Sequence, residues 1–374
     1  MFRPNRWIAL ALAGLCLVVA GCSLNGPISS PSSAPPPAAE SGKVTAPRSG
    51  GKLKVGIASR EITNDYNRDI IAGAAAVFKK HGASVVTTNG GGDETTHENN
   101  IRNLINSGVD AIFIQLGDPE SLAPIVQQAE RRGITVVTAG IGSAIKGAVT
   151  DVGGDEMLMA EMVARALLGA MDYQGDLYAF WVPGAPLLET RLRVLKAVVA
   201  DYPQVRLHLE PTDHSPAKVQ SQMQAVLTAH PKQGSISGVW GAYDQMTSGA
   251  VQAIQQANRP EIKVASIDGD RTTFSMLYAR NSPFVATVVQ NAQRIGSLGA
   301  TAALDARRGE KPPKATFTTA WVATRNNGIA AAEERYGPSI WKRIRLDPDD
   351  IRRRWPQDQQ VVVQQPVVPS DEGR

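Results

Sequence analysis

The sequence is poor in the residues that form cross-links, bind metals or build catalytic centres. Its 374 residues include only two cysteines, Cys16 and Cys22, so the chain beyond its N-terminal segment is stabilised without disulfides and works without thiol chemistry. The formal net charge of +4 is small and gives no argument for nucleic-acid binding. No metal-ligand spacing relates the five histidines, which are His81, His97, His208, His214 and His230. We therefore expect no metal site and no nucleic-acid partner.

Sequence motifs of enzymes and cofactor sites are also missing. There is no His-Glu-x-x-His, no Gly-x-Ser-x-Gly and no phosphate loop that ends in Gly-Lys-Ser/Thr. The nearest pattern, Gly140–Ile145, loosely fits a Gly-x-Gly-x-x-Ala dinucleotide turn. It follows the fourth expected strand rather than the first, and it leads toward another strand. We interpret it as a turn, and we expect no cofactor and no catalytic residues.

An apolar run near the N-terminus ends in a cysteine. Arg3 and Arg6 precede the run, which extends from Trp7 to Ala20 and closes in Val19-Ala20-Gly21-Cys22. This pattern is typical of a secretory signal, and a cysteine directly after small residues resembles a bacterial lipobox. We predict that residues 1–21 are a lipoprotein signal peptide and that Cys22 is lipidated. The alternative is a membrane-spanning anchor, for which the run is short, because a helix needs about 20 residues to cross a bilayer.

The segments that flank the central part of the chain differ from it in composition. After the cysteine, residues 22–51 are rich in Pro, Ser, Ala and Gly, a composition that cannot bury enough surface to offset the entropy lost on ordering. We expect a flexible linker there, which would tether the protein to a membrane surface through the lipid. At the other end, we expect order to fade beyond about Tyr336 and the last residues to form a loosely held tail.

Between these ends, short β-rich runs alternate with segments of helical period. In residues 65–81, Ile70, Ala74, Val77 and Phe78 share one helical face. The expected strands are Leu53–Ala58, Ser84–Thr88, Ala111–Gln115, Thr135–Thr138, Leu177–Val182, Val205–Glu210, Gly238–Gly241 and Val264–Ile267. This alternation predicts an α/β fold of βαβ units, with parallel sheets covered by helices on both faces. So many strands before residue 270 favour two lobes over one.

Polar side chains stand directly after several expected strands, where open α/β sheets bind their ligands. They are Asn64, Tyr66 and Asn67 after the first strand, Tyr243 and Asp244 after Val239–Gly241, Asp268–Asp270 after Ala265–Ile267, and Gln290 and Asn291 after the strand-like run 284–289. Each could instead cap or turn into the next helix. Together they offer carboxylate, amide and phenol groups, which suit a small polar ligand.

At these residues the chain resembles periplasmic binding proteins of the ribose-binding, type I class. The resemblance extends from about Lys52 to Thr324 and rests on the order and spacing of Thr63–Tyr66 before a helix that reaches Gly73, Ala229–Pro231, Gly241–Met246 with Gly249–Ala250, Val264–Gly269 and Ala286–Gln290. It implies two Rossmann-like lobes with parallel sheets, joined by a three-crossover hinge that closes on a ligand. The N-terminal lobe would comprise residues 52–154 and 291–318, the C-terminal lobe 155–290 and 319–335, and a C-terminal extension 336–374.

The resemblance also implies a set of ligand contacts. From the first lobe these are Asn64, Tyr66 and Asn67, and from the second lobe and the hinge they are His214, Tyr243, Asp268 and Gln290. His214 could instead cap a surface turn, and the sequence leaves both readings open.

Two positions depart from the pattern of sugar-binding relatives. Gly140-Ile141 stands where such relatives often carry an Asp-Arg pair, and Glu189 stands where they place an arginine, with Arg191 two residues later. We therefore expect Gly140 and Glu189 in the site and the bidentate hydroxyl clamps to be missing. Because Glu189 and Asp268 are acidic and two tyrosines accompany them, a cation or amine is an alternative to a sugar or polyol.

The leading hypothesis is a lipid-anchored, extracytoplasmic solute-binding protein of an ABC importer. As a monomer it would capture a sugar, polyol or similar small polar solute by hinge closure, without catalysis, and deliver it to an ABC permease in the membrane. The second hypothesis is a binding protein that signals to a membrane receptor kinase. The third, from the enzyme class, is a lipid-anchored α/β hydrolase or oxidoreductase. The sequence does not distinguish an inner-membrane from an outer-membrane anchor.

Overall fold

The computed structural model describes residues 51–356. The predicted signal peptide, Cys22, nearly all of the predicted linker and the final part of the predicted tail lie outside the described residues. Between residues 51 and 356, none of the helices combines the length and apolar character needed to cross a membrane.

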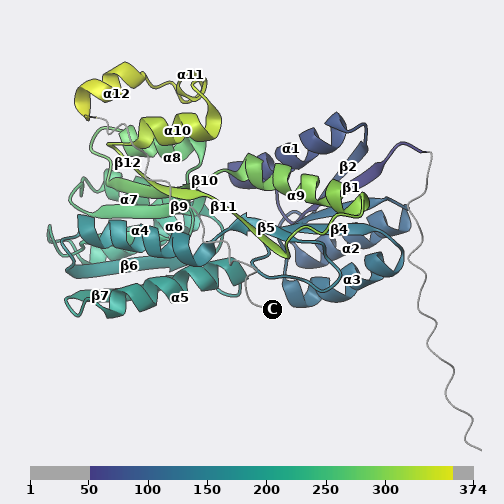
Figure 1. Ribbon diagram of the computed structural model, residues 1–374. Coiled ribbons are helices and arrows are strands. Elements are labelled where there is room, and N and C mark those ends of the chain that lie inside the picture. Colours follow the sequence, from purple (N-terminus) through teal and green to yellow (C-terminus); the bar gives the residue numbers. More distant parts are fainter. Residues whose placement is uncertain (1–50, 357–374) are drawn as a thin grey trace, which may run out of the picture. The chain divides into compact units, whose positions relative to one another are not determined.

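Six parallel strands form the first sheet, in the order β11-β5-β4-β3-β1-β2 (Figure 1). Their bounds are β1 Lys54–Ser59, β2 Ser84–Asn89, β3 Ala111–Gln115, β4 Thr135–Ala139, β5 Asp151–Gly154 and β11 Ala315–Thr318. In the central part, Val55 of β1 is in register with Val85 of β2 and Ala111 of β3. Strand β3 is buried throughout, as expected where helices cover both faces of a sheet.

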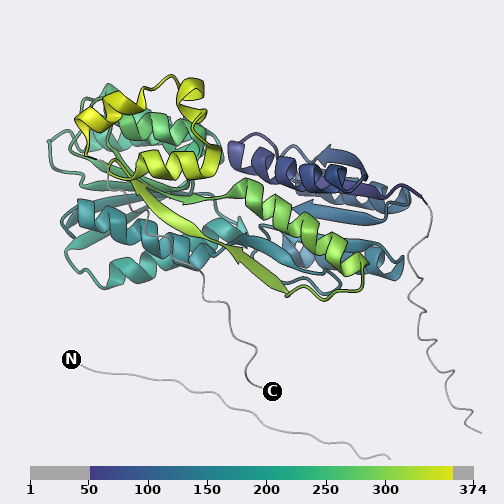
Figure 2. The same cartoon turned by 45° about the horizontal axis from the view of Figure 1, so that its top comes forward.

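Four helices pack on this sheet: α1 Asp65–Lys80, α2 Glu94–Asn106, α3 Pro119–Arg131 and α9 Ala292–Arg307. Helices α1 and α9 lie side by side, although they are far apart in the sequence (Figure 2). Their backbones approach closely at two glycines, since a Cβ atom on Gly73 would lie 2.0 Å from the carbonyl oxygen of Gln293, and one on Gly296 would lie 1.8 Å from that of Ile70. Any larger residue at either position would force the two helices apart.

The second sheet also has six strands, in the order β12-β10-β9-β8-β6-β7. Their bounds are β6 Gly175–Trp181, β7 Val205–Pro211, β8 Gly238–Gly241, β9 Lys263–Asp268, β10 Phe284–Gln290 and β12 Ala320–Thr324. The pairings are parallel except at the edge, where β12 runs antiparallel to β10. Trp240 and Phe284 are fully buried in the core of this lobe.

The helices of this half of the molecule include a C-terminal group that the sequence did not indicate. They are α4 Glu156–Ala170, α5 Pro186–Ala200, α6 Pro216–Ala229, α7 Asp244–Gln256, α8 Arg271–Tyr278, α10 Gly328–Tyr336, α11 Ile340–Ile344 and α12 Pro348–Arg354. The expectation that order fades beyond about Tyr336 is wrong up to residue 356. Trp341 and Ile351 are buried in the core of this lobe, and the Trp341 ring packs 6.2 Å from that of Tyr278. This burial holds the two short helices in place.

The chain passes between the two sheets three times. The passages lie between β5 and α4, between β10 and α9, and between β11 and β12, and a single residue separates the two elements at each one. These residues are Asp155, Asn291 and Thr319. The predicted α/β fold of two lobes with parallel sheets and three crossovers is thereby confirmed. The residue limits that we assign to each domain stay a prediction.

Candidate functional site

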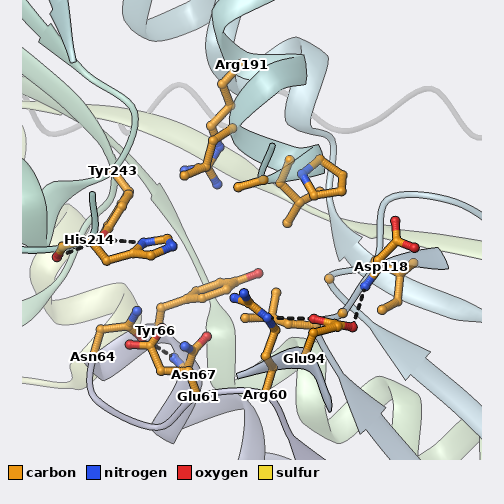
Figure 3. Close-up of a pocket in the computed structure, with 18 of the residues that line it drawn as sticks. Arg60, Glu61, Asn64, Tyr66, Asn67, Glu94, Asp118, Arg191, His214 and Tyr243 are labelled. Atoms are coloured by element: carbon orange, nitrogen blue, oxygen red, sulfur yellow. Dashed lines mark hydrogen bonds and ion pairs between the residues drawn. The ribbon is translucent and has the colours of Figure 1, made fainter. Parts of the chain in front are cut away.

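A cavity of about 320 Å³ lies among loops that follow strands of both sheets (Figure 3). This volume is at the lower end of the range for small-molecule sites, about 300–1,000 Å³. The first lobe contributes Arg60, Glu61, Asn64, Tyr66, Asn67, Glu94, Leu116, Gly117, Asp118, Gly140 and Ile141, and the second contributes Gly184, Ala185, Pro186, Leu187, Leu188, Arg191, His214, Tyr243 and Asp268. The loops at the carboxyl ends of parallel strands thus converge on one space, as in other open α/β sheets.

Most of the site residues expected from the sequence line this cavity. Those that do are Asn64, Tyr66, Asn67, Gly140, His214, Tyr243 and Asp268. Glu189 and Gln290 are not among the lining residues. Contact of any of these side chains with a ligand remains a prediction.

On the first-lobe side, a chain of hydrogen bonds fixes Asn64 and Asn67. The Asn64 side chain accepts a hydrogen bond from the backbone N–H of Asn67, 2.8 Å away, and so caps α1 while it lines the cavity. The Oδ1 atom of Asn67 accepts from Gln115 Nε2 at 2.6 Å, and Gln115 Oε1 accepts from the Ser59 hydroxyl. The helix cap and the ligand contact that we weighed as alternatives for Asn64 are therefore compatible.

A second first-lobe group, which the sequence analysis missed, carries charges that neutralise one another. Arg60 Nε lies 2.8 Å from Glu94 Oε2, and Glu94 Oε1 accepts a hydrogen bond from the backbone N–H of Asp118 at 3.0 Å. In Figure 3 these residues approach the cavity from the same side as Tyr66 and opposite Arg191. The sequence analysis did not single out Glu94, the first residue of α2, although it lies five residues after the end of β2, as Asn64 does after β1.

Arg191 of α5 is the central cation on the second-lobe side. Its side chain is 4% exposed, its Nε lies 2.5 Å from Glu156 Oε2, and its Nη1 donates to the carbonyl oxygen of Ala242 at 2.7 Å. Its guanidinium also lies 3.4 Å from Asp268 Oδ1. The nearby carboxylates keep the pKa of Arg191 above its usual value despite burial, which by itself lowers it, so this side chain is a permanent donor.

Asp268 stands at the end of β9 with one carboxylate oxygen occupied. Its Oδ1 accepts from Gln290 Nε2 at 3.2 Å in addition to Arg191, whereas its Oδ2 accepts no hydrogen bond from any residue in the range 51–356. The backbone φ of Asp268 is +124°, a value that residues other than glycine rarely adopt. Such backbone strain is often found at binding sites. Burial raises the pKa of this carboxyl above its usual value, against the opposing charge of Arg191.

Two buried polar atoms near Asp268 have no hydrogen-bond partner within the described part of the chain. They are the Tyr66 hydroxyl and Gln290 Oε1. Burial raises the pKa of the Tyr66 hydroxyl, as do the nearby Glu156 and Asp268, so it stays protonated and can donate. Buried polar groups are nearly always paired, and of these two only Tyr66 lines the cavity, so its hydroxyl is the one that a ligand in the cavity could pair with.

His214 and Tyr243 form a pair at the edge of the cavity. The Tyr243 hydroxyl lies 3.0 Å from His214 Nδ1 and donates to the His214 carbonyl oxygen at 3.3 Å. Burial lowers the pKa of the His214 ring, which favours its neutral form. His214 therefore lines the cavity and also fixes Tyr243, from the loop between β7 and α6 (Figure 3).

The expectation that Glu189 faces the site in place of an arginine is wrong. Glu189 accepts hydrogen bonds from Trp181 Nε1 at 3.2 Å and from the backbone N–H of Gly184 at 3.0 Å, and so stabilises the loop before α5. Arg191 lines the cavity instead, because two residues along a helix point about 200° apart. An arginine is therefore among the lining residues on the second-lobe side. The other predicted departure, Gly140-Ile141, lines the cavity as expected.

The turn at Gly140–Gly142 holds a carboxylate of the chain itself rather than a nucleotide phosphate. The backbone N–H of Gly142 donates to Asp151 Oδ2 at 2.9 Å, and that of Ile141 lies 3.4 Å from Asp151 Oδ1. The turn leads into strand β5 and not into a helix, so it lacks the helix N-terminus of a dinucleotide site. Within the described range, no group of His, Cys, Asp or Glu side chains is arranged to hold a metal ion.

Comparisons with known proteins agree with this architecture. Residues 55–311 match the periplasmic binding protein domain family. The chain is 28% identical over 267 residues to the ribose import binding protein RbsB of Bacillus subtilis, a match that covers 70% of this chain and 84% of the relative.

Two solved structures illustrate the likeness in three dimensions. One is an ABC transporter solute-binding protein from Mycobacterium smegmatis with bound glycerol, which is 26% identical with a TM-score of 0.68 and is matched over 75% of this chain and 96% of its own. The other is a 5-methylthioribose transporter solute-binding protein from Thermotoga lettingae in complex with 5-methylthioribose, at 25% identity, a TM-score of 0.69 and coverage of 78% and 93%.

Proposed function

The chain belongs to the periplasmic binding protein family, and on that premise we propose that it captures a sugar or polyol outside the cytoplasm and delivers it to an ABC permease. The family is extracytoplasmic, and the matched relatives are substrate-binding transport proteins rather than enzymes. This supports the importer hypothesis over the hydrolase or oxidoreductase alternative. The ligand class is proposed from the ribose, glycerol and 5-methylthioribose named for the relatives.

The observation that carries the proposal is the group of hydrogen-bonding atoms around Asp268. The free Oδ2 of Asp268, the unpartnered Tyr66 hydroxyl and the Arg191 guanidinium belong to residues that line one cavity. Neighbouring ligand hydroxyls can donate to the carboxylate and accept from the arginine or the tyrosine. An amine could also donate to this carboxylate, because the charge of Arg191 is already paired with Glu156 at 2.5 Å, and amines are therefore included in the ligand screen below.

Capture would proceed by closure of the two lobes about the three crossovers. A ligand that touches Tyr66 in the first lobe and Arg191 and Asp268 in the second is bound fully only when the lobes are closed. Its differential affinity for that state shifts the population toward it. The closed shape would then be what the permease recognises. Lipidation of Cys22, after removal of residues 1–21, would keep the protein at the membrane and remains part of the proposal.

A thermal-shift screen of the intact protein against pentoses, hexoses, polyols, nucleosides and small amines tests the ligand class. A ligand that binds only the folded state raises the melting temperature, by an amount that grows with its concentration over Kd. We expect sugars or polyols to raise it, and the effect to be lost in Asp268→Ala. Stabilisation by amines alone, or by no sugar or polyol, would contradict the proposal.

The lipid anchor and the membrane partner need separate experiments. In a bacterial host we expect the unmodified protein in the membrane fraction and Cys22→Ser in the soluble extracytoplasmic fraction, and identical fractionation of the two would argue against the anchor. The alternative partner, a receptor kinase, shares the binding step. Copurification with a permease supports the importer, and copurification with a kinase alone supports the sensor.

A further inference from the structure

One side of the cavity is apolar, in contrast to the polar group around Asp268. Leu116 and Ile141 line it from the first lobe, and Pro186, Leu187 and Leu188 line it from the second. Ile141 and Leu188 are buried, whereas Leu116 and Leu187 keep part of their surface open. A plain sugar would present only its C–H groups to this surface, because its hydroxyl groups need hydrogen-bond partners.

The apolar side chains meet at the Gly140–Gly142 turn. A Cβ atom placed on Gly140 would lie 3.2 Å from Leu116 Cδ2 and 3.7 Å from the Tyr66 hydroxyl, and one placed on Gly142 would lie 2.8 Å from Leu187 Cδ2. Leucines from both lobes therefore border the same turn. The unpartnered Tyr66 hydroxyl stands between this apolar group and the polar one.

Leu116 has a backbone conformation that is unfavourable for residues other than glycine. Its φ is +61°, in the left-handed region where a residue other than glycine costs about 1 kcal/mol or more. Its backbone N–H donates to the carbonyl oxygen of Ala139 at 3.0 Å, and its own carbonyl oxygen accepts from Nε2 of the fully buried His97 at 3.1 Å. A glycine would adopt this conformation without strain but would not supply the side chain with which Leu116 lines the cavity.

The cations beside this region are already paired, whereas the Glu61 and Asp118 carboxylates, which also line the cavity, form no ion pair within the described residues. Arg60 lies 2.8 Å from Glu94, and Glu94 in turn accepts the backbone N–H of Asp118. Asp151, behind the turn, accepts from the backbone N–H groups of Ile141 and Gly142. An anionic ligand substituent would find no free cation among these groups and would have to shed its water. A neutral, apolar substituent meets no such penalty.

We propose that the ligand is a pentose or pentitol that carries a small apolar substituent, such as a methyl, methylthio or short alkyl group, which Leu116, Ile141 and Leu187 enclose. This inference rests on the proposed function, because it places the hydroxyl groups of the same ligand at Asp268, Arg191 and Tyr66. It specifies what that function leaves open, the part of the ligand that distinguishes it from a plain sugar.

Isothermal titration of the intact protein with D-ribose, 5-deoxyribose, 5-methylthioribose and propyl riboside tests the inference. Burial contributes about 0.8 kcal/mol per methylene equivalent, so a methylthio group, which corresponds to about two, should tighten binding at least about tenfold over ribose, and a fully enclosed propyl group by about sixtyfold. In Leu116→Gly, which relieves the backbone strain and therefore folds, the advantage should fall to threefold or less. Leu116→Asn, which also tolerates the left-handed conformation, should behave alike. The control Leu209→Ala, at a half-exposed leucine of β7 outside the cavity, should keep the full advantage.

The outcomes separate this inference from the function on which it rests. If ribose binds and no substituted ribose binds more tightly, the apolar site is refuted while sugar capture stands. If the substituted sugars bind more tightly than ribose but Leu116→Gly leaves the ratio of their affinities to that of ribose unchanged, the assignment to Leu116 is refuted. If none of the four sugars binds and the wider screen is also silent, the proposed function itself fails.

Discussion

Asp244 and Asp268 are both buried aspartates that follow neighbouring strands of the second sheet, but their surroundings differ. The Asp244 carboxylate accepts hydrogen bonds only from its own lobe: from the side chains of Ser266, Thr273 and Thr287 and from the backbone N–H groups of Gly269 and Asp270. Asp268 uses one oxygen for Arg191 and Gln290, and its other oxygen has no partner in the described range. A buried carboxylate whose acceptor sites are filled by its own fold is structural, and one that keeps a site free beside a cavity can bind a ligand.

The two regions are also connected through the backbone. The N–H of Gly269 donates to Asp244 Oδ2 at 2.6 Å, directly after the strained φ of +124° at Asp268. The carbonyl oxygen of Asp268 accepts a hydrogen bond from Arg335 of α10. Asp244 and Arg335 therefore hold the strained Asp268 in position without contacting the cavity themselves. We call them positioning residues.

The largest expected effect comes from Asp244→Ala. Removal of the carboxylate leaves three buried donors without an acceptor, the Ser266 and Thr273 hydroxyls and the backbone N–H of Asp270, whereas Gly269 and Thr287 keep a second acceptor. Each unsatisfied donor costs about 1–3 kcal/mol, so the free energy of unfolding should fall by about 3 kcal/mol or more. Urea unfolding measures it. Asp244→Asn, which keeps one acceptor oxygen, should lose less. An unfolding free energy within 1 kcal/mol of the unmodified protein would remove the distinction between the two aspartates.

Asp268→Ala should weaken ligand binding strongly and lower the free energy of unfolding less than Asp244→Ala does. Loss of charge-assisted hydrogen bonds to ligand hydroxyls, worth about 1.5–3 kcal/mol, predicts a ten- to hundredfold weaker affinity for the sugar found in the screen. Arg191 keeps Glu156 as its partner, so stability should fall less than in Asp244→Ala. Calorimetric titration and urea unfolding of both variants measure the two quantities. A loss of stability equal to that of Asp244→Ala, with affinity intact, would reverse our assignment.

The pH dependence of stability should distinguish the same residues. Burial raises the pKa of Asp268 above its ordinary value of 3.8, so the folded state binds the proton more tightly than the unfolded state does. The free energy of unfolding should therefore fall as pH rises from about 4 toward neutrality, and Asp268→Asn should reduce that fall by at least about 1 kcal/mol. Urea titrations between pH 4 and 7 measure it. Parallel pH profiles for the two proteins would mean that other carboxyls, such as Asp244 or Asp270, account for the dependence.

The smallest effect is expected outside the cavity, at Arg271 of α8. Its guanidinium lies 3.1 Å from Asp65 and 3.1 Å from Asp69, both on α1 of the first lobe, and its side chain is 25% exposed. Partly exposed ion pairs contribute about 0–1 kcal/mol, so Arg271→Gln should weaken ligand affinity by no more than about fivefold, and less at high salt. Titrations at two ionic strengths measure this. An effect as large as that of Asp268→Ala would show that lobe contact outside the cavity dominates binding.

The sequence predicted those parts of the fold that have strong periodicity. Ala111–Gln115 and Gly238–Gly241 coincide with β3 and β8, because both are short apolar runs with clear ends. Strand β5 was missed, since Asp-Val-Gly-Gly has little β propensity and is held by its neighbours β4 and β11. Helices α11 and α12 were missed because they are shorter than the window in which helical periodicity can be seen.

The site was predictable where a strand end determines the position of a side chain. Asp268 ends β9, Asn64 and Tyr66 lie at the start of the helix that follows β1, and all three line the cavity. We expected Glu189 in the site rather than Arg191, although the helical periodicity of α5 indicates the opposite. Its buried face carries Leu188, Arg191, Leu192 and Leu195. The pairing of Arg60 with Glu94 brings together a residue that follows β1 and the first residue of α2, and no single-sequence pattern reports such a contact.

The sheets are completed by one short stretch of chain, residues 315–324, which supplies β11 to the first sheet and β12 to the second. During synthesis, a nascent chain that stops before this stretch lacks an edge strand of both lobes, however much of either lobe has already been made. The lobes therefore cannot mature one after the other from the N-terminus, as separate domains commonly do. Folding to the native state has to wait until about residue 324 has been synthesised, and truncated chains would expose two unfinished sheet edges at once.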